Sequence, residues 1–367
     1  MIAPAELPQS GVRGNFHQLA VSGIQRVAED AVAVTFEVPP GLREVFQFRA
    51  GQHLTLRFDL GHGDQRRSYS ICTPAPHGPL RIGVRRLAGG LVSTHIHDHL
   101  RVGDLVDVMP PAGSFTLAKG PSLGRLVALA AGSGITPVLS LVATALRSDP
   151  EAEFTVVYSN RSVGSAMFLD ELADLKDCWP ARVQLVHLFS REPQTVASRN
   201  GRLDPARLRG LIEELGSPQS VSTWYLCGPL GMVANAQQVL GETGIPLERV
   251  KRELFFVEDE PPVRSAAEAM ELARPGEVTV RARLNGRETT FVTRRDLALV
   301  DGLAAVREDA PFSCKGGVCA TCRARLVEGR VAMDHTYALD ASDRDHGFVL
   351  TCQAHPLTDV IVLDYDA

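Results

Sequence analysis

The sequence SCKGGVCATC, residues 313–322, contains three cysteines in a C-x4-C-x2-C spacing. A fourth cysteine, Cys352, follows after a further 29 residues. This combination is typical of the plant-type [2Fe-2S] cluster. Because the cluster and its thiolates are negatively charged, the loop must direct backbone N–H groups at sulfur, and Gly316 and Gly317 permit so tight a turn. We therefore expect four iron ligands: Cys314, Cys319, Cys322 and Cys352.

Two other interpretations of these cysteines remain open, a structural zinc site and a disulfide framework. Zinc usually takes C-x2-C pairs at both ends of its site, and disulfide frameworks are typical of small secreted chains. The chain starts with MIAPAELPQSGVRGNFHQ, which has no basic segment followed by an apolar core, and four of its seven cysteines cluster in a ligand pattern. We therefore favour the iron–sulfur cluster and expect a cytoplasmic protein.

Composition predicts a soluble globular protein of two or three domains. The chain has 367 residues, of which 44% are hydrophobic and 22% charged, and its formal net charge of -5 indicates no partner among nucleic acids or anionic membranes. One stretch, Leu126–Leu146, lacks charged residues and is long enough to cross a bilayer. Its middle reads GSGITP, which would break a spanning helix, so we predict a buried strand, a glycine turn and a helix.

The spacing of apolar residues along the chain indicates three domains and a linker. Residues 14–118 form short alternating segments separated by Gly and Pro, which predicts an antiparallel β-barrel or sandwich. Residues 119–256 alternate strand and helix patterns, which predicts a doubly wound parallel sheet. Residues 257–275 indicate a linker, and residues 276–367 begin with a hairpin pattern around Asn285-Gly286.

Two motifs in the first domain could hold a phosphorylated ligand. RRSYSICTPAP, residues 66–76, places a cation, an aromatic hydroxyl and a small hydroxyl close together on a strand. GVRRLAGGLVSTHIHDHL, residues 83–100, offers paired glycines before a helical run, which is a plausible cradle for a diphosphate. Ordinary packing at a sheet surface is the other interpretation of both motifs.

The RxYS segment followed by a glycine–serine turn resembles the flavin-binding signature of the ferredoxin–NADP+ reductase family. The resemblance implies that Arg67 pairs with the flavin diphosphate, that Tyr69 packs on the isoalloxazine, and that Ser70 lies near its reactive N5. It implies FAD as the flavin, because a diphosphate cradle would stay unfilled by FMN. The residues implied to hold the diphosphate are Gly90, Val92 and Ser93.

Two motifs of the second domain resemble that family's nicotinamide-nucleotide loops. In AAGSGITP, residues 130–137, glycines permit close backbone approach to a diphosphate at a helix N-terminus. CGP, residues 227–229, places Cys227 near the nicotinamide, and Ser70 and Cys227 are the implied catalytic residues. Cys227 could otherwise be a small buried apolar residue. The implied nucleotide contacts are Gly132, Gly134, Thr136, Cys227, Gly228 and Pro229.

Nucleotide preference and flavin shielding depend on two further segments. Arg161, after the strand ending in VYSN, offers a planar fork for a 2′-phosphate, and no acid directly follows Tyr158 to bind a 2′-hydroxyl. NADPH is therefore favoured over NADH. In the resembled family an aromatic residue covers the flavin, and KRELFF offers Phe255 or Phe256, although both could belong to the core.

The third domain resembles the β-grasp ferredoxin, and the order of domains resembles the reductase components of multicomponent oxygenases. The implied path runs from NADPH to FAD to the [2Fe-2S] cluster, since a flavin can accept a hydride and release single electrons. The implied partner is an oxygenase component, in first place that of the diiron phenylacetyl-CoA epoxidases. Oxygenases of steroid or aromatic ring hydroxylation are alternatives, and so is a non-redox interaction protein that binds zinc.

Overall fold

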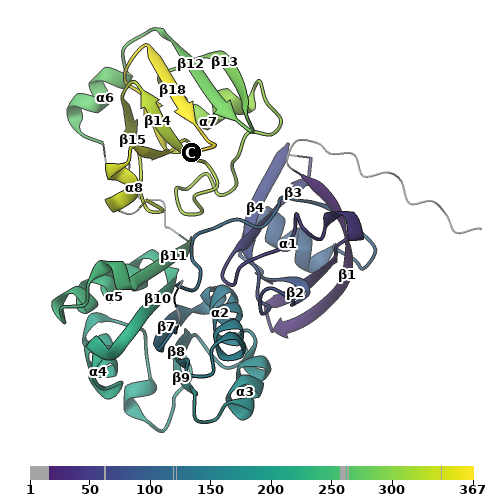
Figure 1. Ribbon diagram of the computed structural model, residues 1–367, viewed down its shortest axis with the longest axis vertical. Coiled ribbons are helices and arrows are strands. Elements are labelled where there is room, and N and C mark those ends of the chain that lie inside the picture. Colours follow the sequence, from purple (N-terminus) through teal and green to yellow (C-terminus); the bar gives the residue numbers. More distant parts are fainter. Residues whose placement is uncertain are drawn as a thin grey trace, which may run out of the picture.

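Figure 1 shows the computed structural model, which describes residues 16–61, 63–118, 120, 122–256, 262, 264–339 and 341–367. Three bodies follow one another along the chain, and each contains its own sheet (Figure 1). We call them the N-terminal domain (β1–β6), the central domain (β7–β11) and the C-terminal domain (β12–β18). Among the described residues, no helix combines the length and apolar character that crossing a membrane requires.

The N-terminal domain is an antiparallel barrel, as the alternating segments predict. Its 6-stranded sheet has the order β4-β3-β6-β1-β2-β5, and an isolated bridge between Ile71 and Ile82 connects the two outer strands. Alternate apolar side chains such as Leu54, Leu56 and Ile82 are fully buried inside it. The elements are β1 (His17–Ala28), β2 (Ala31–Glu37), the 3-10 helix η1 (Pro40–Leu42), β3 (His53–Asp59), β4 (Asp64–Ser70), β5 (Leu80–Arg85), α1 (Leu91–Asp98) and β6 (Leu105–Val108).

The central domain is a doubly wound parallel sheet with the order β11-β10-β7-β8-β9. The uncharged stretch from Leu126 forms β7, a tight turn and α2, as predicted, because both faces of β7 are covered by helices. The strands are β7 (Arg125–Ala131), β8 (Glu153–Asn160), β9 (Val183–Phe189), β10 (Val221–Pro229) and β11 (Val250–Phe256). The helices are η2 (Gly132–Gly134), α2 (Ile135–Ser148), α3 (Leu169–Cys178), η3 (Ala197–Arg199), α4 (Pro205–Glu214), η4 (Pro218–Ser220), α5 (Leu230–Glu242) and η5 (Leu247–Arg249).

The C-terminal domain has a mixed sheet with the order β13-β12-β18-β14-β16 and a small second sheet of β15 and β17. Asn285 and Gly286 both have positive φ, as a two-residue hairpin turn requires, so the predicted hairpin is confirmed. The elements are β12 (Glu277–Leu284), β13 (Arg287–Arg294), α7 (Leu299–Ala304), β14 (Arg323–Glu328), β15 (Val331–Met333), α8 (Ala341–Asp345), β16 (Phe348–Leu350), β17 (Ala354–Pro356) and β18 (Val360–Asp364).

The segment expected to be a linker contains a short helix, α6 (Ala266–Leu272). Ser265 caps this helix by accepting a hydrogen bond from the Glu268 N–H, while the Glu268 carboxylate accepts one from the Ser265 N–H. Residues 257–261 and 263 of the expected linker lie outside the described residues. The alanine-rich composition and the capping box therefore make part of this segment helical, although the segment has no sheet pattern.

Candidate functional site

One cleft brings together residues that the sequence analysis assigned to different motifs. Its walls come from β4, from the β5–α1 turn, from the end of β7, from β11 and from the cysteine loop. The predicted flavin residues Arg67, Tyr69 and Ser70 line it, and so do the predicted cluster ligands Cys314 and Cys319. The predicted diphosphate residues also line the cleft: Gly90, Val92 and Ser93. The three domains therefore meet at this cleft.

β4 and β11 face each other across the cleft through polar side chains. Ser70 is buried, and its hydroxyl donates a hydrogen bond to Glu253 Oε2 at 3.4 Å. Glu253 Oε1 lies 3.7 Å from Nδ1 of the buried His53. Burial raises the pKa of Tyr69 well above its usual value, against the opposing effect of the Arg67 charge, so its phenol stays neutral.

The sequence analysis missed Glu253 and His53, although both line the cleft. Glu253 precedes Phe255 by two positions in β11, so the alternation of a strand places the two side chains on one face. Phe255, one of the two aromatic residues predicted to cover the flavin, lines the cleft as well. The position of the Phe256 side chain lies outside the described part of the structure.

The glycine turn before α1 fits a diphosphate. Gly89 has a φ of +73°, and a Cβ on Gly90 would lie only 2.6 Å from Ser93 Oγ. The Ser93 hydroxyl accepts a hydrogen bond from the Leu87 N–H at 3.1 Å and is within 3.3 Å of the Gly90 carbonyl oxygen, which fixes the turn. The bare backbone, the start of α1 and the exposed Arg67 together provide the donors and positive charge that a diphosphate needs.

The nucleotide turn at the end of β7 is packed tightly against β10. A Cβ on Gly134 would lie 2.2 Å from the Cys227 carbonyl oxygen, so glycine is required there, whereas Gly132 has a φ of +57° and open space around it. The Thr136 hydroxyl donates to the Ser133 carbonyl at 2.9 Å and so stabilises the first turn of α2. Gly132 and its surroundings fit the close approach of a nucleotide diphosphate.

Cys227 lies beneath this turn and is fully buried. Burial raises the pKa of its thiol well above the usual value, and the nearby Glu253 carboxylate raises it further. The thiol therefore stays protonated, and it lies at the end of β10, beside the Gly134 turn. A Cβ on Gly228 would lie 3.1 Å from the Ala131 Cβ in β7, and Pro229 occupies the N-cap position of α5.

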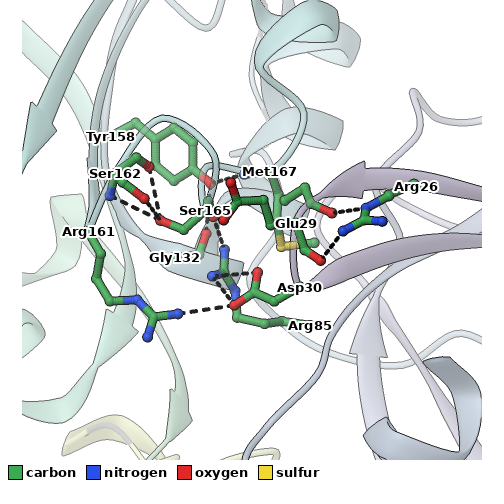
Figure 2. A network of polar contacts seen from close by, with 11 residues as sticks. Arg26, Glu29, Asp30, Arg85, Gly132, Tyr158, Arg161, Ser162, Ser165 and Met167 are labelled. Carbon is green, nitrogen blue, oxygen red and sulfur yellow. Dashed lines mark hydrogen bonds and ion pairs between the residues drawn. The ribbon is translucent and has the colours of Figure 1, made fainter. Parts of the chain in front are cut away.

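Arg161 lies directly after β8 and takes part in a polar network between the N-terminal and central domains (Figure 2). Its Nη2 donates to Asp30 Oδ2 at 3.0 Å, and Arg85 of β5 pairs with the same carboxylate at 3.1 Å (Figure 2). The Arg161 side chain is 53% exposed. The sequence analysis missed Asp30, because its turn is far from residue 161 along the chain.

The four predicted cluster ligands gather as two pairs of thiols. Cys314 lies beside Cys319, and Cys322 lies beside Cys352. The first pair lines the cleft, and the second is buried. Within the described ranges, no three His, Cys, Asp or Glu side chains converge on a single metal position. Two thiol pairs fit a dinuclear cluster, in which each iron takes two thiolates, better than one tetrahedral zinc ion.

The cysteine loop directs N–H donors at sulfur, as negatively charged ligands require. The Cys319 thiol and the backbone N–H groups of Val318, Gly316 and Cys319 lower the pKa of Cys314 to about 5, against the opposing effect of burial. The Gly316 N–H lies 3.4 Å from Cys314 Sγ. By contrast, the interaction with Cys314 raises the pKa of Cys319, and the interaction with Cys352 raises the pKa of Cys322.

The conformation of this loop differs in part from the expectation. Gly317 has a φ of +74°, and a Cβ there would lie 3.0 Å from Gln353 Cγ, so this glycine permits the turn as predicted. Gly316 has no positive φ; instead Lys315 and Ala320 take left-handed conformations. Gln353 holds the loop from outside by donating to the Lys315 carbonyl at 2.8 Å. Tertiary contacts therefore stabilise backbone conformations that the sequence pattern does not reveal.

Three family models match successive parts of the chain. Residues 18–117 match the oxidoreductase FAD-binding domain, residues 128–238 the oxidoreductase NAD-binding domain, and residues 282–357 the 2Fe-2S iron-sulfur cluster binding domain. These matches agree with the expected cofactors. The glycine turn and Tyr69 lie in the first range, Gly134 and Cys227 in the second, and the four cysteines in the third.

Whole-length relatives have the same organisation. The chain is 38% identical to one of the subunits of 1,2-phenylacetyl-CoA epoxidase of Escherichia coli (strain K12), over 96% of this chain and 98% of that protein. It is 31% identical to the ferredoxin reductase component of 3-ketosteroid-9-alpha-monooxygenase of Rhodococcus rhodochrous, over 95% and 96%. The solved structure of phthalate dioxygenase reductase matches with 25% identity and a TM-score of 0.58, over 95% of this chain and 98% of that one. The chain therefore belongs to the ferredoxin reductase family and is a nicotinamide-nucleotide-dependent oxidoreductase with FAD-, NAD- and 2Fe-2S-binding domains.

Proposed function

We propose that this protein transfers electrons from NADPH through FAD and the [2Fe-2S] cluster to the oxygenase component of a phenylacetyl-CoA epoxidase, a diiron enzyme. The observation that carries the proposal is the shared cleft, where the flavin residues of β4, the β7 turn and the Cys314–Cys319 pair line one space. A bound flavin would supply the step between hydride chemistry and single-electron chemistry.

The residues of the chain bind and orient in this scheme. Tyr69 is neutral and offers a flat apolar surface, and Phe255 lines the opposite part of the cleft on β11. The Ser70 hydroxyl donates to Glu253 Oε2 at 3.4 Å across the cleft, so a hydroxyl and a carboxylate lie beside the residues proposed to hold the flavin. The neutral Cys227 supports the nucleotide turn without adding charge.

The NADPH preference is supported by Arg161, whose exposed guanidinium can accept a 2′-phosphate. Asp30 neutralises one side of this arginine, so a nucleotide that carries the phosphate competes with an ion pair already formed. The predicted preference for NADPH over NADH should therefore be moderate. Arg85 also pairs with Asp30, which leaves Asp30 partnered after Arg161 turns to the nucleotide.

The choice of oxygenase rests on the relatives. The epoxidase component is 38% identical to this chain and the steroid monooxygenase component 31%, so the epoxidase is the first candidate and the steroid enzyme the second. The test combines the purified reductase with each oxygenase component and measures NADPH oxidation that depends on phenylacetyl-CoA or on a 3-ketosteroid. We expect coupled turnover with the epoxidase component. Turnover with the steroid enzyme alone would replace this assignment by the second candidate.

A further inference from the structure

Arg66 is a buried arginine in β4, one position before the predicted flavin residue Arg67. Only 3% of Arg66 is exposed. Its charge is neutralised by Asp64 on the same strand, with Nη2 at 2.6 Å from Oδ2 and Nε at 2.9 Å from the same oxygen. A buried charge with one carboxylate still has further N–H donors to satisfy, because a guanidinium carries five.

The remaining donors of Arg66 bind the C-terminal domain. Nη1 donates to the Ala310 carbonyl at 2.7 Å, and Nη2 donates to the Glu308 carbonyl at 3.3 Å. The guanidinium also lies over the Phe312 ring, 3.9 Å from its centroid, and 5.0 Å from the centroid of the Phe16 ring. Arg66 thus joins two domains through two backbone carbonyls and an aromatic ring.

These contacts lie at the entrance of the cluster loop. Phe312 precedes the first cluster cysteine, Cys314, by two residues. The next side chain on the same face of β4, Ser68, hydrogen-bonds to Ser313 with its hydroxyl oxygen at 2.9 Å. Tyr69 and Ser70 then continue into the cleft. Residues of one strand, β4, therefore line the cleft predicted to hold the flavin and also contact the start of the cluster loop.

We propose that Arg66 is a positioning residue that holds the cluster loop against the flavin cleft and so sets the rate of electron transfer into the cluster. The inference rests on the proposed electron path from flavin to cluster. In that step the reduced flavin is oxidised by one electron and the cluster is reduced by one, with NADPH as the source of the electrons. Arg66 touches no reacting atom, and its effect is on the distance and orientation of the two sites.

The experiment measures two reductions separately in the full-length holoprotein. Wild type, Arg66→Ala and Arg66→Lys are mixed with NADPH without oxygen in a stopped-flow spectrometer, at matched flavin and cluster content. Loss of the charge-assisted hydrogen bonds should slow cluster reduction by about tenfold or more in Arg66→Ala. Flavin reduction should change by less than about twofold, because the hydrogen bonds of Arg66 go to Asp64 and to the C-terminal domain. Arg66→Lys keeps the positive charge but lacks the planar guanidinium. Its rate of cluster reduction should therefore lie between those of wild type and Arg66→Ala.

Arg57→Ala is the matched control. Arg57 lies on the neighbouring strand β3, sits over the same Phe16 ring at 4.1 Å, and pairs with Asp107 inside the N-terminal domain. The Arg57→Ala substitution should leave the rates of flavin reduction and of cluster reduction unchanged. Small-angle X-ray scattering gives a readout besides activity, and the radius of gyration should rise in Arg66→Ala but not in Arg57→Ala.

Three results would overturn the inference. Cluster reduction at the wild-type rate in Arg66→Ala would show that the contacts do not position the loop. Loss of bound flavin or cluster in both Arg66 variants would make Arg66 a residue of the fold rather than of electron transfer. Failure of NADPH to reduce the cluster in wild type would refute the proposed electron path itself, which is a different failure from an unaffected variant.

Discussion

Gly134→Ala tests the geometry of the nucleotide turn. The added Cβ would lie 2.2 Å from the Cys227 carbonyl oxygen and 2.6 Å from the carbonyl carbon, and both are backbone atoms of β10 that cannot rotate away. An ordinary contact needs 3.4 Å or more, so the turn must move by roughly 1 Å. A displacement of that size near reacting groups costs about 100-fold in rate. We expect kcat/KM for NADPH to fall by about that factor, with a loss of about 1–3 kcal/mol in stability.

Gly231→Ala is the control for this prediction. Gly231 lies in α5 with nothing within 4 Å of an added Cβ, so the substitution should be neutral or slightly stabilising. The assay is the rate of flavin reduction by NADPH in a stopped-flow spectrometer, with flavin content and thermal unfolding measured on the same samples. Wild-type hydride transfer in a folded Gly134→Ala variant would refute the close packing of the two strand ends.

Three other predictions follow from the same geometry. Arg161→Ala should raise KM for NADPH, with a loss of at most about 1.5 kcal/mol in binding because Asp30 already pairs with this arginine, and leave KM for NADH nearly unchanged; equal effects on both nucleotides in steady-state assays would remove Arg161 as the discriminator. Flavin released by heat should run as FAD on chromatography, because residues 89–94 form a diphosphate cradle; recovery of FMN alone would contradict this. The Leu123 and Glu151 N–H groups lower the pKa of Asp149, so its contribution to stability is present above the unfolded pKa of about 3.9 and is lost as pH falls below it. Asp149→Ala should therefore show a smaller drop in melting temperature than wild type between about pH 4 and pH 2, and an identical drop would contradict the assignment.

Local sequence patterns were sufficient for the fold class and for the motifs. Continuous apolar residues from Leu126 predicted a covered strand, Asn285-Gly286 predicted a hairpin, and the cysteine spacing predicted the cluster domain that the family model confirms. Each of these features depends on residues within one short segment. The physical preference of the segment therefore decides its structure before any long-range contact forms.

The sequence pattern could not predict the contacts between domains. Glu253 meets Ser70, Asp30 meets Arg161, and Arg66 meets the carbonyl of Ala310, although each pair is far apart along the chain. The sequence pattern around a charged residue in a strand is the same whether that residue faces water or another domain. Only the assembled structure shows that Arg66 is buried and that its neighbour Arg67 is exposed.

The most direct test of the electron path is the ratio of two activities in wild type and in Cys319→Ala, at matched flavin content. The variant removes one of four thiolates, so the cluster should assemble poorly, while the flavin and nucleotide sites lie on other elements. Reduction of ferricyanide by NADPH should persist, because this small oxidant can take electrons from the flavin directly. Reduction of cytochrome c or of the oxygenase component should collapse. Equal loss of both activities would mean that the cysteine loop holds the fold rather than carries electrons, and persistence of both would mean that electrons leave without passing through the C-terminal domain.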